Sequence, residues 1–161
     1  MINKAAHRHK HAWITHEQAL SRQTQALASL HPVFATRVES VVAHLRKKGW
    51  QAFVWEGKNR SRKQAEQNAQ TGVGIKKSWH RRDIRGRLGD QVIELYAADI
   101  VDERWGWEGP AADLDHPFWN DLGEYAKAEG LEWGGTWDNR RDVAHVQMKI
   151  IDAPPTGSVV V

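Results

Sequence analysis

The sequence predicts a single α+β domain. Two observations favour this class: segments with helical periodicity lie apart from segments rich in β-formers, and no repeat or linker divides the chain. A length of 161 residues is enough for one domain with a real core. With 40% hydrophobic and 27% charged residues, the composition is ordinary for a globular protein.

A first helix is expected over residues 16–31. Thr15 and Gln18 have the spacing of a capping box, in which each side chain bonds the backbone N–H of the other residue. The apolar stripe of this helix should be Leu20, Leu27 and Leu30.

A second helix is expected from Pro32, because proline suits the first helical turn. Lys47, Lys48 and Gly49 predict its end, with cations near the negative pole of the helix dipole and glycine just past the last turn. Apolar residues with helical spacing should face the core: Phe34, Val38, Val41, Val42 and Leu45.

The remainder of the chain carries signals for further strands and helices. Strands are predicted at 50–55, 91–101 and 144–151, a polar helix at 61–70, and a third major helix at 117–130. The third helix should turn Phe118, Leu122 and Tyr125 inward.

The last strand, "AHVQMKII", has two different faces. Val146, Met148 and Ile150 share one face, which must be buried, so the face of His145, Gln147 and Lys149 should look into solvent or a cleft. Asp142 lies three residues before His145, and in a regular strand these two side chains would point to opposite faces. They can serve one site only if Asp142 belongs to the preceding loop.

Two further residues could join them. His80 in "KSWH", Asp99 in "AADIV" and His145 would form a set of two histidines and an aspartate, the pattern of a catalytic zinc that keeps one position open. Asp142 would then take a proton from the attacking water. The competing interpretation is structural, because the chain has nine histidines and a single histidine in a strand usually belongs to the core or the surface.

The composition limits which kinds of site and partner the chain could have. The chain has no cysteine, so disulfides and thiolate metal sites are excluded. No apolar run approaches the length of a membrane span, and the N-terminus lacks the apolar core of a signal peptide. The net charge of +3 allows nucleic acid or an anionic cell-wall polymer as a partner, but is too small to choose between them.

Motifs in order along the chain resemble the zinc D-alanyl-D-alanine carboxypeptidase and L-alanyl-D-glutamate endopeptidase family, which includes small phage endolysins. The matching stretches are "LHP" at 30–32, "EGKNRSRKQAE" at 56–66, "SWH" at 78–80, "AADIV" at 97–101, "LEWGGTW" at 131–137 and "DVAH" at 142–145. The resemblance implies a small antiparallel sheet with helices packed on it, as in Hedgehog and D-Ala-D-Ala peptidase domains.

Carried over by position, the resemblance implies a Zn²⁺ ion held by His80, Asp99 and His145, with Asp142 as the catalytic acid and base. It implies substrate-binding roles for Arg60, Ser78, Trp133 and Trp137.

Two departures leave alternatives open. Asp99 lies 12 residues further from His80 than the family spacing, so Asp83 and Asp90 are rival ligands, although only Asp99 has the family's strand context. Asn59 occupies the ungapped position of the substrate arginine, which leaves Arg60 and Arg62 as candidates.

The resulting expectation is a zinc metallopeptidase that hydrolyses the peptidoglycan stem peptide, at the L-Ala-D-Glu bond, as an endolysin. Alternatives are a D-Ala-D-Ala carboxypeptidase and an inactive zinc-containing wall-binding module. We expect a monomer, with no nucleic-acid partner and no stable membrane insertion, made in the host cytoplasm without a signal peptide and reaching the wall after the membrane is permeabilised. The expected layout is a flexible basic arm at 1–14, the peptidase domain at 15–152 and a tail at 153–161.

Overall fold

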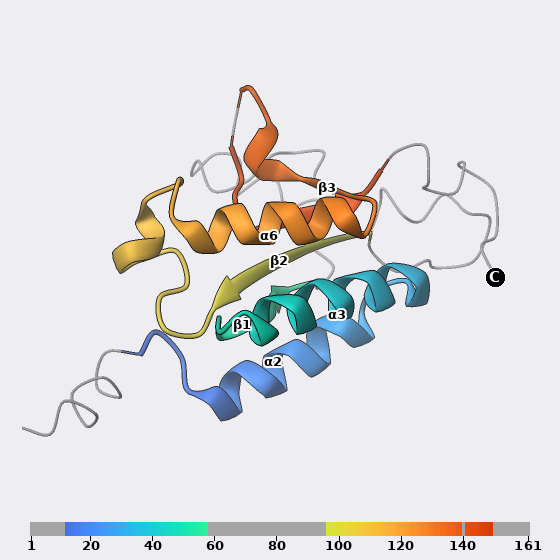
Figure 1. Ribbon diagram of the computed structural model, residues 1–161. Helices are drawn as coiled ribbons and strands as arrows, with labels where there is room; N and C mark the ends of the chain where they lie inside the picture. Colours follow the sequence, from blue (N-terminus) through green and yellow to red (C-terminus); the bar gives the residue numbers. More distant parts are fainter. Residues whose placement is uncertain (1–11, 58–95, 140, 150–161) are drawn as a thin grey trace, which may run out of the picture.

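In the computed structural model, which describes residues 12–57, 96–139 and 141–149, helices pack on a four-stranded antiparallel sheet (Figure 1). The helices are α2 (His16–Ala28), α3 (Pro32–Lys47) and α6 (Pro117–Ala128). The strands are β1 (Ala52–Glu56), β2 (Ala97–Asp102), β3 (Leu131–Trp133) and β4 (His145–Met148), in the order β1-β2-β4-β3. The α+β class is therefore confirmed.

Short sequence motifs determine where these helices begin. Thr15 and Gln18 form the predicted capping box of α2. The other two helices begin with a His-Pro pair: His31 before α3 and His116 before α6 each accept a backbone N–H through the imidazole, and the proline occupies the first turn. The start of α3 matches the prediction, whereas α2 ends at Ala28, three residues before the expected end.

The buried face of α2 differs from the predicted stripe. Ala19 and Ala26 are buried, and the side-chain oxygen of Gln23 accepts a hydrogen bond from the backbone N–H of Val54. The side of α2 that meets β1 is therefore made of small and polar residues. Leu20 directly follows Ala19, so its side chain points about 100° around the helix from the side that meets β1. It is 39% exposed, and its prediction as a core residue was wrong.

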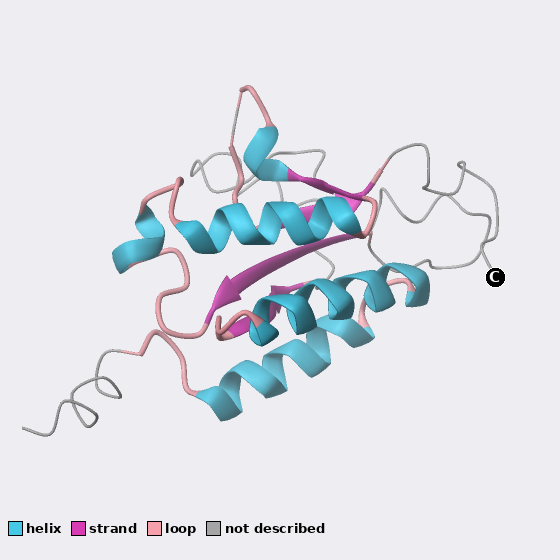
Figure 2. Ribbon diagram, in the orientation of Figure 1, coloured by secondary structure: helices cyan, strands magenta, loops and turns pink. Residues whose placement is uncertain are grey.

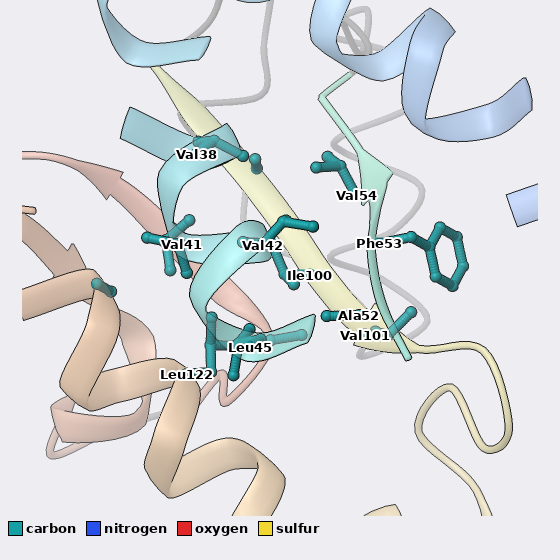
Figure 3. Close-up of a cluster of buried hydrophobic side chains, with 14 of the residues drawn as sticks. Val38, Val41, Val42, Leu45, Ala52, Phe53, Val54, Ile100, Val101 and Leu122 are labelled. Carbon is teal, nitrogen blue, oxygen red and sulfur yellow. The ribbon is translucent and has the colours of Figure 1, made fainter. Parts of the chain in front are cut away.

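The core lies between the sheet and the two helices α3 and α6, which cover the same face (Figures 1 and 2). All five predicted core residues of α3 are buried. Figure 3 shows Val42 and Leu45 directed toward Ile100 of β2, with Leu122 of α6 beside Leu45. Phe118 is also fully buried, while Tyr125 is half-buried and stacks on His44 of α3.

Other parts of the layout depart from the sequence expectations. The short strand β3 was not predicted, and two 3₁₀ turns, η1 (Gly109–Ala112) and η2 (Gly134–Thr136), lie in stretches expected to be turns. Trp13 and Ile14 donate backbone hydrogen bonds to the carbonyls of Arg104 and Glu103, so the ordered fold begins before residue 15. The predicted helix at 61–70 and the tail at 153–161 lie outside the described residues.

Within the described part of the chain, no helix combines the length and apolar character needed to cross a bilayer.

Truncation of the core should be costly. Leu45→Ala is expected to lower the free energy of unfolding by about 2–5 kcal/mol, because Leu45 is fully buried and its loss leaves a cavity between α3 and α6. Leu20→Ala is the matched control, and it should change stability by about 0.5 kcal/mol or less. Urea denaturation of both variants measures the difference; equal losses would contradict the assigned core.

Candidate metal centre

The register between β2 and β4 brings two of the predicted ligands together. Asp99 pairs directly with His145 across the two antiparallel strands, so both side chains leave the same face of the sheet. Nδ1 of His145 lies 3.4 Å from Oδ1 of Asp99. The neighbouring residues Ile100 and Val146 belong to the core, so the Asp99–His145 face is the one turned away from α3 and α6.

Asp142 completes the cluster from the loop before β4. The strand begins at His145, which leaves Asp142 outside it and meets the condition for the two to share a site. Oδ2 of Asp142 lies 4.0 Å from Nδ1 of His145. The side chain of Asp142 is 45% exposed and that of Asp99 only 12%, so one carboxylate faces solvent and the other is enclosed.

The first glycine of the Trp-Gly-Gly turn, Gly134, occupies a position that has no space for a side chain. A Cβ on Gly134 would overlap the backbone carbonyl oxygen of Asp142, and the carbonyl of Gly134 accepts the backbone N–H of Asp142 at 3.0 Å. The φ angle of Gly134 is not positive, so the requirement is for space and not for an unusual backbone conformation. Close backbone approach therefore places Asp142.

Trp133 holds this loop from the other side. Its indole N–H donates to the carbonyl of Val143 at 2.7 Å. Its ring lies so close to Gly135 and to Gly123 of α6 that a Cβ on either glycine would overlap it. The tryptophan is thus packed between α6 and the loop that carries Asp142.

The electrostatics of His145 favour a positive charge at the cluster. The residue is buried, which alone would lower its pKa. The hydrogen bond with Asp99 and the negative charges of Asp99 and Asp142 outweigh burial and raise the pKa of His145 above its ordinary value.

The donor set fits a divalent cation. One imidazole nitrogen and two carboxylate oxygens, from Asp99, Asp142 and His145, lie within 4.8 Å of one another. Nitrogen and oxygen donors of this kind bind Zn²⁺, and three protein ligands with an open position are typical of its catalytic sites. Because a metal binds only a deprotonated imidazole nitrogen, binding of a cation here would compete with protonation of His145.

Several predicted site residues lie outside the described residues: His80, Ser78 and Arg60, together with their rivals Asp83, Asp90 and Arg62. Their roles stay predictions. The two tryptophans are described. The contacts of Trp133 with α6 and Val143 account for its position without a substrate, while Trp137 lies beside the cluster, with its ring centroid 5.0 Å from that of His145.

Gln147 had no role in the sequence prediction, which named Glu132 only as the next candidate for the base after Asp142. Gln147 bonds Nε2 of His145 through its side-chain oxygen at 2.8 Å, and its amide nitrogen donates to Oε2 of Glu132 at 2.7 Å. The alternation of the last strand did place Gln147 on the face of His145, which was the available signal. Glu132, Trp137 and neighbouring residues also line an open pocket of about 500 Å³ beside the cluster.

Comparison with known proteins agrees with this fold. No family model matches the chain. The peptidoglycan L-alanyl-D-glutamate endopeptidase CwlK of Bacillus subtilis (strain 168) is 24% identical over 148 residues, which cover 86% of this chain and 84% of the relative. The crystal structure of the L-Ala D-Glu endopeptidase ChiX of Serratia marcescens matches with a TM-score of 0.55 and 22% identity, over 81% of this chain and 89% of that chain. The resemblance to this peptidase family is confirmed, and the fold is that of a solved endopeptidase.

Substitution of the first turn glycine should disturb the cluster selectively. Gly134→Ala is expected to displace the loop that carries Asp142, because its Cβ would overlap the Asp142 carbonyl, and thus to lower the pKa of His145, which the charge of Asp142 helps to raise. Gly130→Ala is the control: its φ of +73° makes alanine costly, by about 1 kcal/mol, but a Cβ there meets only the end of Arg37. NMR titration of the His145 ring and unfolding curves compare the two variants. An unchanged pKa of His145 in Gly134→Ala would refute the steric argument.

Removal of the neighbouring charges should lower the pKa of His145 in the metal-free chain. Asp99→Asn should have the larger effect, because Asp99 contributes both a hydrogen bond and a charge, whereas Asp142 contributes a charge alone. NMR titration of the His145 ring measures the order. Since protonated imidazole cannot bind a metal, zinc affinity should also fall as the pH decreases through this raised pKa. An unchanged pKa in Asp99→Asn would contradict the assignment.

Proposed function

We propose that this protein is a zinc-dependent peptidoglycan peptidase that hydrolyses the stem peptide at the L-Ala-D-Glu bond. The observation that carries the proposal is the convergence of Asp99, Asp142 and His145 on one sheet face, in a fold similar to that of an L-Ala D-Glu endopeptidase. The relative CwlK carries the same activity in its name and aligns over most of both chains, which supports the choice of bond.

The exposures of the two carboxylates support a division of roles. Asp99 is enclosed and directly opposite His145, which suits a fixed ligand, and we assign His80 as the third ligand. Asp142 is half-exposed and slightly farther from His145, which suits a group that exchanges protons with water. Zinc bound here would supply a Lewis acid that polarises the scissile carbonyl and lowers the pKa of water.

In this scheme Asp142 is the proton carrier. Its carboxylate accepts a proton from the attacking water and returns it to the nitrogen of the leaving amine. Glu132 is less suited to that work, because both of its carboxylate oxygens already accept hydrogen bonds, from Gln147 and from Trp137. We further assign binding of the substrate carboxylate to Arg60, with Ser78 beside it, since an arginine suits bidentate carboxylate binding.

We also propose that the protein acts as an endolysin, made in the host cytoplasm and reaching the wall after the membrane is permeabilised. The mild positive charge is consistent with attraction to an anionic wall.

Digestion of purified peptidoglycan tests the proposal directly. Mass analysis should find new N-terminal D-Glu and C-terminal L-Ala ends, and a chelator should abolish their formation until zinc is restored. Release of D-Ala alone would instead identify a carboxypeptidase. Binding to the wall without any product would identify a wall-binding module.

The roles of Asp142 and His145 are separated by two variants. Asp142→Asn should keep zinc and fold but lose activity by about 10²–10⁴-fold, because the amide is nearly isosteric and cannot accept the proton. His145→Ala should lose zinc as well. Asp113→Asn, at an exposed aspartate outside the cluster, is the control and should behave as the wild type. Loss of zinc from Asp142→Asn would make Asp142 a ligand, and near-normal turnover would place the base elsewhere.

A further inference from the structure

Behind His145, on the side away from Asp99 and Asp142, lies a chain of hydrogen bonds. Nε2 of His145 bonds Oε1 of Gln147 at 2.8 Å, and Nε2 of Gln147 donates to Oε2 of Glu132 at 2.7 Å. Gln147 is buried, and it pairs with Glu132 across β4 and β3. The sheet register therefore builds the chain just as it builds the Asp99–His145 pair.

The direction of each hydrogen bond follows from the carboxylate at the end of the chain. Both carboxylate oxygens of Glu132 accept hydrogen bonds, so the NH₂ group of Gln147 must face it. The oxygen of the Gln147 amide then faces His145 and can only accept. Nε2 of His145 must therefore carry a hydrogen, and in the neutral ring Nδ1 is left with its lone pair.

Trp137 contacts both Glu132 and His145. Its indole N–H donates to Oε1 of Glu132 at 3.2 Å, which occupies the second carboxylate oxygen. Its ring lies against the imidazole, with centroids 5.0 Å apart and planes at 49°. Glu132 is thus held in place by Trp137, which directly follows the η2 turn, and by Gln147 of β4, and the imidazole is restrained on its face and at Nε2.

We propose that Gln147 and Glu132 are positioning residues that fix the tautomer and orientation of His145, so that the Nδ1 lone pair points at Asp99 and Asp142. The inference deepens the proposed function, because it assigns Nδ1 as the atom of His145 that binds zinc. It rests on contacts that exist in the metal-free chain and is therefore testable without turnover. Partners of this kind typically change metal affinity by about 10- to 100-fold when they are removed.

Glu132→Gln is the informative variant. It removes the fixed acceptor, so the amide of Gln147 can turn over and present its NH₂ group to His145, which permits the other tautomer. Gln147→Leu removes the acceptor at Nε2 altogether while keeping a side chain of similar size. Glu124→Gln, at an exposed position on α6, removes the same charge from the helix that covers the other face of the sheet and is the matched control.

The first measurement is the tautomer of His145 in the zinc-free protein. With ¹⁵N-labelled histidine, at a pH where the ring is neutral, the wild type and Glu124→Gln should carry the ring hydrogen on Nε2. The signal is identified by its absence from His145→Ala. Glu132→Gln should show a mixture of tautomers. A hydrogen on Nδ1 in the wild type, or an unchanged tautomer in Glu132→Gln, would overturn the proposal.

The second measurement is zinc affinity by competition with a chelator. Glu132→Gln and Gln147→Leu should each bind zinc about 10- to 100-fold more weakly than the wild type. Since Glu132 acts through Gln147, the double variant should bind no more weakly than Gln147→Leu alone. Additive losses would mean that Glu132 acts by another route, and unfolding curves of the zinc-free variants check that each still folds.

The two measurements separate this inference from the proposed function. If the wild type binds no zinc, the proposed function fails, while the tautomer still decides whether Gln147 and Glu132 position His145. If the wild type binds zinc and cleaves peptidoglycan but Glu132→Gln has the same tautomer and affinity, the positioning role alone is wrong.

Discussion

The antiparallel pairing of β2 with β4 is the constraint on which the site depends. Asp99 and His145 are 46 positions apart in the sequence, and only their direct pairing across the two strands brings their side chains to one face. A slip of one residue would send one of the two into the core and bring an apolar neighbour to the site. The same buried face that stabilises the fold, through Ile100 and Val146, thereby protects the geometry of the cluster.

The site also depends on a loop that cannot take its shape from the sheet. Asp142 lies outside β4, and its place is set by contact of its backbone with Gly134 and by the hydrogen bond from Trp133 to Val143. The "WGG" stretch is therefore understood as packing: one large ring and two residues without side chains let two pieces of backbone approach closely. The enclosed carboxylate of Asp99 comes from a strand, and the solvent-facing carboxylate of Asp142 comes from a packed loop. The two carboxylates therefore lie in different environments.

Local signals predicted much of the fold. The capping box at Thr15 and the proline and apolar stripe of α3 depend on near neighbours in sequence, and each was found. In the last strand Val146 and Met148 are buried as predicted, but His145 and Gln147 on the other face are buried as well. The three-residue strand β3 is too short to show a period, and it forms because β4 offers its edge. Leu20 was misassigned because the side of α2 that packs is chosen by β1, which is distant in sequence.

For the site, the residues alone gave a candidate set that included Asp142 with His145, and the family resemblance implied a role for each member of the set. Neither could reveal the hydrogen bonds from His145 through Gln147 to Glu132, because these depend on the register of β3 with β4. A glutamine two positions after a histidine becomes informative only when its cross-strand partner is known. Sequence patterns thus identified which residues have reactive chemistry, and the sheet determined which of them meet.

The contact between Trp133 and Gly123 has a consequence for how the protein tolerates mutation. Gly123 lies on α6, on the opposite side of the sheet from the acidic cluster, yet the ring that it accommodates is hydrogen-bonded to the loop that carries Asp142. Sensitivity to mutation will therefore extend beyond the residues of the acidic cluster. Directed evolution of the helices for stability has to keep residue 123 small, because a larger side chain there would displace Trp133 and with it the loop that carries Asp142.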